Sequence, residues 1–171
     1  MLERPGIITM KGKPLTLVGQ EVKVGDPAPD FAVVANDLSG FRFSSLQGQV
    51  CVICSVPSLD TPTCDIETRN FNEEAAKLGP AVNILTISMD LPFAQKRWCG
   101  AAGVESLKTY SDHREAAFGL AYGVLIKELR LLARAVFVVD QEGKLQHIQL
   151  VPELANEPDY EAVLQALARL A

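Results

Sequence analysis

The chain has 171 residues, of which 48% are hydrophobic and 22% are charged, and its formal net charge is −5. This length and composition fit one globular domain that can fold without disulfides or a structural metal, and they exclude a disordered chain. The acidic charge balance gives no electrostatic basis for binding nucleic acid or an anionic membrane surface.

The N-terminal segment predicts a β-hairpin in a cytoplasmic protein. Two strand-like runs, at 7–9 and 15–18, flank a Lys-Gly-Lys-Pro turn, so we expect a hairpin at about residues 5–20. The segment lacks the apolar core and cleavage site of a signal peptide, and no apolar stretch in the chain approaches the roughly 20 residues that span a bilayer. In the cytoplasm, cysteines are usually reduced, catalytic or redox-sensing rather than structural. The four cysteines of this chain are therefore the first candidates for chemistry.

The rest of the chain alternates between strand-type and helix-type patterns. Strands are predicted at 31–35, 50–56, 82–89, 133–139 and 144–151, and helices at 62–78, 90–100, 115–122 and 158–170. We expect Asp90 to cap the second of these helices and Gly100 to end it directly after Cys99. The order of elements predicts a single α/β domain over residues 1–171, with a mixed sheet covered by helices on both faces.

Cys51 and Cys54 have the C-x-x-C spacing of redox-active dithiols, but they lie in the apolar strand-like run VCVICSV. A redox dithiol of this type works when its first cysteine starts a helix. Side chains three positions apart on a strand point to opposite faces of the sheet, so the two sulfurs could not meet there. We therefore interpret both residues as buried core cysteines.

Cys64 lies at a predicted helix start. Thr61 is a favourable N-cap and Pro62 a favourable first helical residue, which places Cys64 in the first turn. Unpaired backbone N–H groups and the helix dipole favour an anion at this position. On a helix the sulfur shares a face with Phe71, so it should point toward the core rather than into open solvent.

Arg134 is the one cation in the apolar run LLARAVFVVD, in phase with Val136 and Val138. A buried guanidinium is costly without an anionic partner, and a cysteine thiolate in the same part of the sheet would serve as one. A structural ion pair, or an arginine that reaches water at the strand end, is the alternative interpretation.

Cys99 lies at the end of its predicted helix, where a frayed turn would suit a thiol that must move. A bond between Cys99 and Cys64 would close a loop of 35 residues, which constrains the unfolded chain by roughly 4 kcal/mol in the loop-entropy treatment. The sequence alone does not give the distance between the two sulfurs.

These residues resemble a known family. Pro57-x-x-x-Thr61-x-x-Cys64 matches the P-x-x-x-T-x-x-C signature of the peroxiredoxins. The strings PSLDTPTC, DLPFAQKRWCG, ARAVFVVD and EPDYEAVLQAL look like the thiol peroxidase subfamily, an atypical 2-Cys type, and the likeness runs over essentially the whole chain. The family does not use cysteines at positions 51 and 54, and Val56 stands where an aromatic residue is more usual.

The resemblance implies a thioredoxin-like fold with an added N-terminal hairpin, commonly in a homodimer. It assigns the peroxidatic role to Cys64 and the resolving role to Cys99, which would form an intramolecular disulfide. It implies that Thr61 and Arg134 orient and activate the peroxidatic sulfur and that Pro57 shields it. It further implies hydrogen peroxide and alkyl or lipid hydroperoxides as substrates and thioredoxin as reductant.

Two other functions remain open at this point. A thiol–disulfide oxidoreductase would use Cys51 and Cys54. A metal-binding module could combine cysteines with His113 or His147, although the sequence has no H-E-x-x-H motif and only one close cysteine pair. No G-x-G-x-x-G or P-loop motif supports a nucleotide cofactor.

Overall fold

A computed structural model of the chain describes residues 2–105 and 107–170. Its strands are β1 (Glu3–Met10), β2 (Lys13–Val18), β3 (Ala32–Val34), β4 (Gly40–Arg42), β5 (Val50–Ser55), β6 (Val82–Ser88), β7 (Lys108–Ser111), β8 (Leu125–Ile126), β9 (Leu131–Leu132), β10 (Ala135–Val139) and β11 (Leu145–Leu150). Its helices are η1 (Phe43–Leu46), α1 (Pro62–Leu78), η2 (Gly79–Ala81), α2 (Pro92–Ala102), α3 (Ala117–Ala121) and α4 (Tyr160–Ala168). No helix within the two described ranges is long and apolar enough to cross a membrane.

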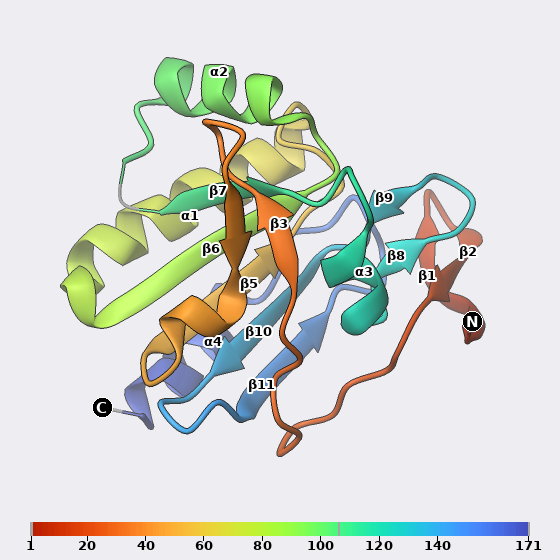
Figure 1. Cartoon of the computed structure of the whole chain (residues 1–171). Coiled ribbons are helices and arrows are strands. Elements are labelled where there is room, and N and C mark those ends of the chain that lie inside the picture. Colours follow the sequence, from red (N-terminus) through yellow and green to blue (C-terminus); the bar gives the residue numbers. More distant parts are fainter. Residues whose placement is uncertain (1, 106, 171) are drawn as a thin grey trace.

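The main sheet is mixed, with the strand order β11-β10-β5-β6-β7-β3-β4 (Figure 1). The pairs β5–β6 and β6–β7 are parallel and the remaining neighbours are antiparallel. Every residue of β5 is buried, as expected for a central strand covered on both faces. The predicted mixed α/β architecture is confirmed.

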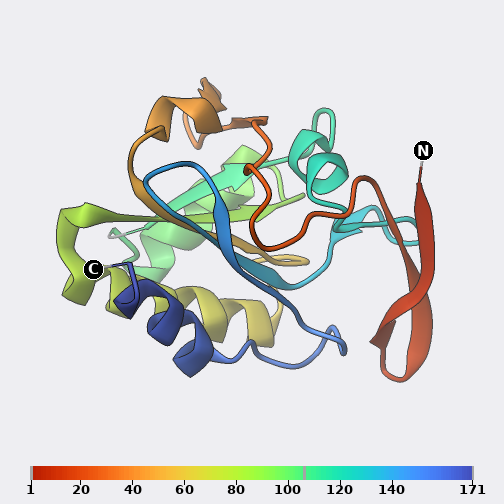
Figure 2. The same ribbon diagram turned by 90° about the horizontal axis from the view of Figure 1, so that it is seen from below.

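Helices cover both faces of this sheet. Helices α1 and α4 lie side by side on one face, whereas α3 lies on the other (Figure 2). The core is correspondingly divided into two clusters. The first contains Phe118 of α3 and the second contains Phe71 of α1, Trp98 of α2 and Val163 of α4. The second cluster also contains Cys64, which places this sulfur on the face covered by the longer helices.

The predicted N-terminal hairpin is present and extends further than the sequence indicated. Strands β1 and β2 pair antiparallel, and β2 continues through β8 and β9 into a second sheet of four strands. Leu17 and Ile126, which face each other across β2 and β8, are completely buried. The two-residue strands β8 and β9 are too short to produce a recognisable alternation, so the sequence pattern could not reveal this sheet.

Helix α2 differs from its prediction at both ends. Leu91 is the N-cap residue and makes no side-chain capping bond, and the helix continues past Gly100 to Ala102. Gly103, in the left-handed conformation with φ of 68°, ends it. Asp90 does not cap the helix, because its carboxylate accepts hydrogen bonds from Ser58 and Leu59 in the loop before α1. Cys99 therefore lies inside the last turn of α2, and it is not the residue at which the helix ends.

Helix α3 is shorter than predicted, since it covers only Ala117–Ala121. The carboxylate of Asp112 accepts hydrogen bonds from the backbone N–H groups of Phe118 and Gly119, at 3.1 and 2.8 Å. Asp112 is itself buried, and burial raises its pKa to about 6 although these hydrogen bonds oppose the shift. The residues before Ala117 thus form a turn around a buried carboxylate in place of a first helical turn.

Candidate functional site

The loop at residues 57–61 connects the end of β5 to α1, and a carboxylate from the next strand–helix connection holds it in place. Asp90 accepts hydrogen bonds from the Ser58 hydroxyl at 2.7 Å and from the Leu59 N–H at 2.8 Å. The hydroxyl of Ser88 also donates to Asp90, at 2.8 Å. Because these bonds satisfy both carboxylate oxygens, Asp90 fixes the backbone from which α1 starts.

The start of α1 has the geometry that the sequence predicted. The Thr61 side chain accepts a hydrogen bond from the Cys64 N–H at 3.3 Å, and its carbonyl accepts from the Asp65 N–H at 2.9 Å, so Thr61 is the N-cap. Pro57, at the beginning of the loop, is buried. Cys64 has no exposed surface. Its sulfur is thus held in the first helical turn, where backbone N–H groups favour an anion.

Arg134 brings a positive charge to this buried helix start. Its guanidinium is 2% exposed and donates from Nε and Nη2 to the Leu154 carbonyl, at 3.2 and 2.9 Å. Burial alone would lower the pKa of Arg134, but its electrostatic interactions and hydrogen bonds with the Cys64 and Glu67 side chains outweigh this effect and raise it. The structure therefore brings Thr61, Cys64 and Arg134 together, and it also gives Arg134 a buried ion pair, the alternative that the sequence left open.

Glu67 is the residue of this site that the sequence analysis missed. It lies on α1 three positions after Cys64, is completely buried, and accepts a hydrogen bond from Nη1 of Arg134 at 2.7 Å through Oε2. Its other oxygen, Oε1, has no hydrogen-bond partner among the residues that the structure describes. Burial raises the pKa of Glu67 to about 7, although the charge of Arg134 and its hydrogen bond oppose the shift. The sequence signal that could have revealed Glu67 is an acidic residue on the face of α1 that points toward the core.

The N-terminal hairpin supports this site from a distance. The Thr9 N–H donates to the Pro152 carbonyl and the Leu154 N–H donates to the Thr9 carbonyl, both at 2.8 Å. The Thr9 hydroxyl also donates to the carboxylate of Glu153, at 3.2 Å. Strand β1 therefore fixes the segment whose Leu154 carbonyl accepts from Arg134.

Cys51 and Cys54 lie on opposite faces of β5, as strand geometry requires. Cys51 belongs to the core cluster under α3, and Cys54 to the cluster under α1 and α4. Burial raises the pKa of Cys51 to about 11, and burial together with the charge of Glu67 raises that of Cys54 well above its usual value. This geometry does not assemble the dithiol that an oxidoreductase using Cys51 and Cys54 would need.

Cys99 is half-buried on α2 and makes no bond to Cys64, since all four cysteines are free thiols. Its sulfur lies 3.3 Å from the hydroxyl of Thr109, which in turn donates to the amide oxygen of Asn36 at 3.1 Å. An open pocket of about 530 Å³ borders Cys99 on this side. The structure thus places Cys64 and Cys99 on neighbouring helices but does not bring their sulfurs into contact.

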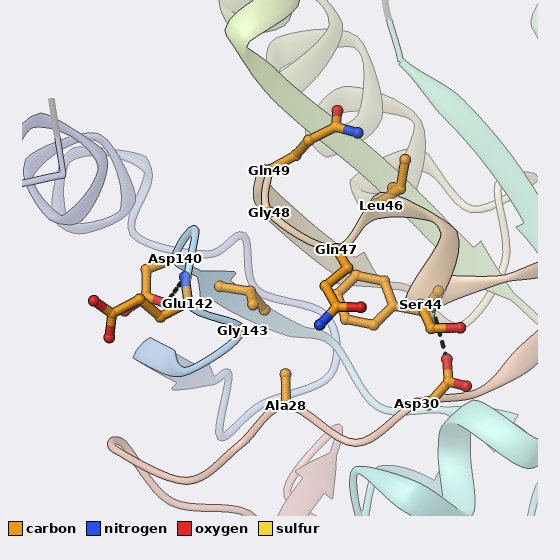
Figure 3. A pocket seen from close by; sticks show the side chains of 12 residues that line it. Ala28, Asp30, Ser44, Leu46, Gln47, Gly48, Gln49, Asp140, Glu142 and Gly143 are labelled. Atoms are coloured by element: carbon orange, nitrogen blue, oxygen red, sulfur yellow. Dashed lines mark hydrogen bonds between the residues drawn. The ribbon is translucent and has the colours of Figure 1, made fainter.

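A second pocket, of about 260 Å³, lies between η1 and the β10–β11 turn (Figure 3). Its two aspartates, Asp30 and Asp140, already accept hydrogen bonds, from the Ser44 and Glu142 N–H groups among others. No cysteine or histidine lines it.

The histidines of the metal-binding hypothesis do not form a ligand set in the structure. Nδ1 of His113 lies 2.8 Å from the Ser111 hydroxyl, and His147 lies on β11, where burial lowers its pKa. Within residues 2–105 and 107–170, no group of three or more His, Cys, Asp or Glu side chains could hold a metal ion.

Comparison with known proteins gives a consistent result. The family model described as Redoxin matches residues 23–164. The chain is 57% identical to a thiol peroxidase of Bacillus subtilis over 163 residues, which cover 95% of this chain and 97% of that protein. It is 59% identical to a thiol peroxidase of Oceanobacillus iheyensis over 160 residues, covering 94% and 97% of the two chains.

Solved structures share the fold. A peroxiredoxin-like protein from Aquifex aeolicus superposes with a TM-score of 0.90 at 45% identity, covering 96% of each chain. A thiol peroxidase from Chromobacterium violaceum superposes with a TM-score of 0.84 over 95% of each chain, at 18% identity, and therefore supports the fold alone.

The raised pKa of Glu67 predicts a pH-dependent contribution to stability. Because the fold favours the protonated carboxyl, this contribution is complete below the ordinary pKa of 4.5 and is lost as the pH rises toward about 7. The unfolding free energy of the wild type, relative to that of Glu67→Gln, should therefore fall between about pH 4.5 and pH 7. Urea unfolding at a series of pH values measures this difference.

Glu73→Gln, at an exposed position of the same helix, is the control and should show no such trend. A constant difference across this range for Glu67→Gln would contradict the assignment.

Proposed function

Because this chain belongs to the Redoxin family and is a thiol peroxidase, we propose that it reduces hydroperoxides through a sulfenic acid at Cys64 and a disulfide between Cys64 and Cys99. The observation that carries this proposal is the position of Cys64, which is buried in the first turn of α1 beside the Arg134 guanidinium. Among the four cysteines, all within the part of the chain that the structure describes, Cys64 alone combines a helix start with a cationic neighbour.

In the first step, the Cys64 thiolate attacks the terminal oxygen of the hydroperoxide. An S–O bond forms, the O–O bond breaks, and the leaving alkoxide takes a proton to become an alcohol or water. The Thr61 hydroxyl and the Arg134 guanidinium hold the two peroxide oxygens, and Pro57 shields the sulfur from bulk solvent. Donors that are already fixed where charge develops lower the barrier. The Glu67 carboxylate and the Leu154 carbonyl keep the guanidinium in place for this task.

In the second step, Cys99 attacks the Cys64 sulfenic acid, so that a disulfide forms and water leaves. Cys99 contacts Thr109 and not Cys64 in this structure, and Cys64 is completely buried. The step therefore requires local unfolding around the two cysteines. An external dithiol then reduces the disulfide by exchange, and we propose thioredoxin for this role.

The proposed substrates, oligomeric state and location are those that the family resemblance implies. We propose hydrogen peroxide and alkyl or lipid hydroperoxides as substrates, a homodimer as the working form, and the cytoplasm as the location. An open pocket of about 270 Å³ lies beside Thr61 and Pro62, with Leu59 and Trp98 in its wall, and could receive the organic part of a hydroperoxide. The proposal includes no cofactor and no metal.

Single cysteine substitutions test the two-step cycle. Cys64→Ser should abolish hydroperoxide consumption, because the attacking sulfur is gone. Cys99→Ser should permit one equivalent of oxidation but block turnover with thioredoxin. Stopped-flow measurements of peroxide consumption and a thioredoxin-coupled assay distinguish these two outcomes. Cys51→Ser and Cys54→Ser are the matched controls, and a folded control variant without turnover would disprove the assignment.

Substitution of the buried arginine tests its role in the first step. A lysine ammonium cannot reproduce the planar guanidinium fork, so Arg134→Lys should slow the oxidation of Cys64 by about tenfold to a hundredfold. The rate constant for the first oxidation, measured in the Cys99→Ser background, reports this effect. Arg42→Lys, at an exposed ion pair with Asp30, is the control. An unchanged rate constant in Arg134→Lys would remove Arg134 from the mechanism.

A further inference from the structure

Trp98, the only tryptophan of the chain, connects the helix of Cys64 to the helix of Cys99. Its indole is 9% exposed, and its Nε1 donates a hydrogen bond to Oδ1 of Asp65 at 2.8 Å. Asp65 directly follows Cys64 on α1, and Trp98 directly precedes Cys99 on α2. The contact therefore joins the nearest neighbours of the two thiols.

Arg69 completes this contact. Its Nε donates to Oδ2 of Asp65 at 2.9 Å, one turn along α1, and its guanidinium carbon lies 5.7 Å from the centre of the Trp98 ring. Its Nη1 also donates to the carbonyl of Ala102, the last residue of α2, at 3.4 Å. We call the group of Asp65, Arg69 and Trp98 the Trp98 clasp.

The clasp holds the part of α2 that has to move. A disulfide between Cys64 and Cys99 needs their Cα atoms about 4.4–6.8 Å apart. Trp98 and Cys99 are neighbours on one helix, so their side chains point about 100° apart around its axis. While Trp98 is bound to Asp65, Cys99 is turned toward Thr109 on β7. Turning this sulfur toward Cys64 would rotate the turn of α2 that also carries Trp98, and we expect this rotation to break the bond between the indole and Asp65.

The hydrogen bonds of Gln95, one turn before Cys99 on α2, can persist when the clasp opens. Gln95 is completely buried and donates to the Ser88 hydroxyl and the Tyr110 carbonyl, at 3.0 and 2.8 Å. Downstream of Gln95, the side-chain hydrogen bonds between α2 and the rest of the described chain are those of the clasp and the one between Cys99 and Thr109. The clasp is therefore the main polar restraint on the turn that carries Cys99.

We propose that the Trp98 clasp sets the rate at which Cys99 resolves the Cys64 sulfenic acid, an inference that rests on the proposed function above. Opening of the clasp allows the Cys99 thiol to displace water from the sulfenic acid and form the disulfide. While the clasp stays closed, a second hydroperoxide can transfer an oxygen to the same sulfur, which becomes a sulfinic acid as the peroxide is reduced to an alcohol. The clasp thus determines how the sulfenic acid is divided between disulfide and sulfinic acid.

Two variants weaken the clasp in different ways. Trp98→Phe retains the apolar ring but removes the indole N–H, and Arg69→Gln removes the cation from an exposed side chain. A hydrogen bond to a charged group is strong enough that we expect Trp98→Phe to accelerate disulfide formation by about tenfold. Arg69→Gln should accelerate it by about threefold, because exposed ion pairs and cation–π contacts are weaker. The fraction of sulfinic acid at high peroxide should fall in both variants.

The experiment mixes the full-length reduced protein with cumene hydroperoxide, stops the reaction with acid at successive times, and alkylates the remaining thiols. Mass spectrometry then quantifies the sulfenic acid, the disulfide and the sulfinic acid separately. In Arg69→Gln, whose side chain does not line the pocket beside Thr61, the rate of the first oxidation should be unchanged, so a general loss of structure would not imitate the result. Arg97→Gln and Phe93→Leu, at exposed positions of the same helix, are the matched controls and should behave as the wild type.

The outcomes distinguish this inference from the function on which it rests. If Cys64 does not form a sulfenic acid in the wild type, the proposed function fails and the clasp proposal fails with it. If Cys64 is oxidised normally but disulfide formation in Trp98→Phe and Arg69→Gln is unchanged or slower, the clasp proposal alone is overturned. Faster disulfide formation and less sulfinic acid in both variants, with unchanged first oxidation in Arg69→Gln, would support the clasp.

Discussion

The buried ion pair between Arg134 and Glu67 is the interaction on which the rest of the site depends. The Arg134 guanidinium and the Glu67 carboxyl group are 2% and 0% exposed and lose the hydration that both would have in water. Above about pH 7, where Glu67 is ionised, each charge needs the other to remain inside the protein. Removing one partner of such a pair commonly costs about 3–5 kcal/mol, because a charge is then left buried alone. The pair leaves the Arg134 guanidinium next to the Cys64 side chain.

This pair connects parts of the chain that are distant in sequence. Glu67 comes from α1, Arg134 directly precedes β10, and Leu154 follows β11. The hairpin strand β1 fixes the Leu154 segment through Thr9, so the N-terminal addition to the fold contributes to the position of the guanidinium. The reactive sulfur is thereby held from several sides, whereas Cys99 is held on α2 by the contacts of one helical turn. This asymmetry fits a cycle in which the second thiol moves to the first.

The sequence was sufficient to predict those features of the site that depend on one residue and its immediate neighbours. A Thr-Pro pair before Cys64 indicated a helix start, and a cation in an apolar strand indicated a buried charge at Arg134. It was insufficient where the structure depends on a choice between partners. Nothing local shows that the Asp90 carboxylate holds the loop of Ser58 and does not cap α2, and the two-residue strands β8 and β9 form only because β2 offers an edge. The sequence predicts an anionic partner for Arg134 and places an acidic residue on the inward face of α1, but only the packing of α1 against the start of β10 shows that the two residues pair.

The most direct test of the account is a disulfide map of the protein after treatment with one equivalent of hydroperoxide. Peptide mass spectrometry of the non-reduced digest shows which cysteines are joined. The account predicts a single intramolecular linkage between Cys64 and Cys99, with Cys51 and Cys54 still reduced in the core. A linkage between Cys51 and Cys54, with Cys64 unoxidised, would contradict it.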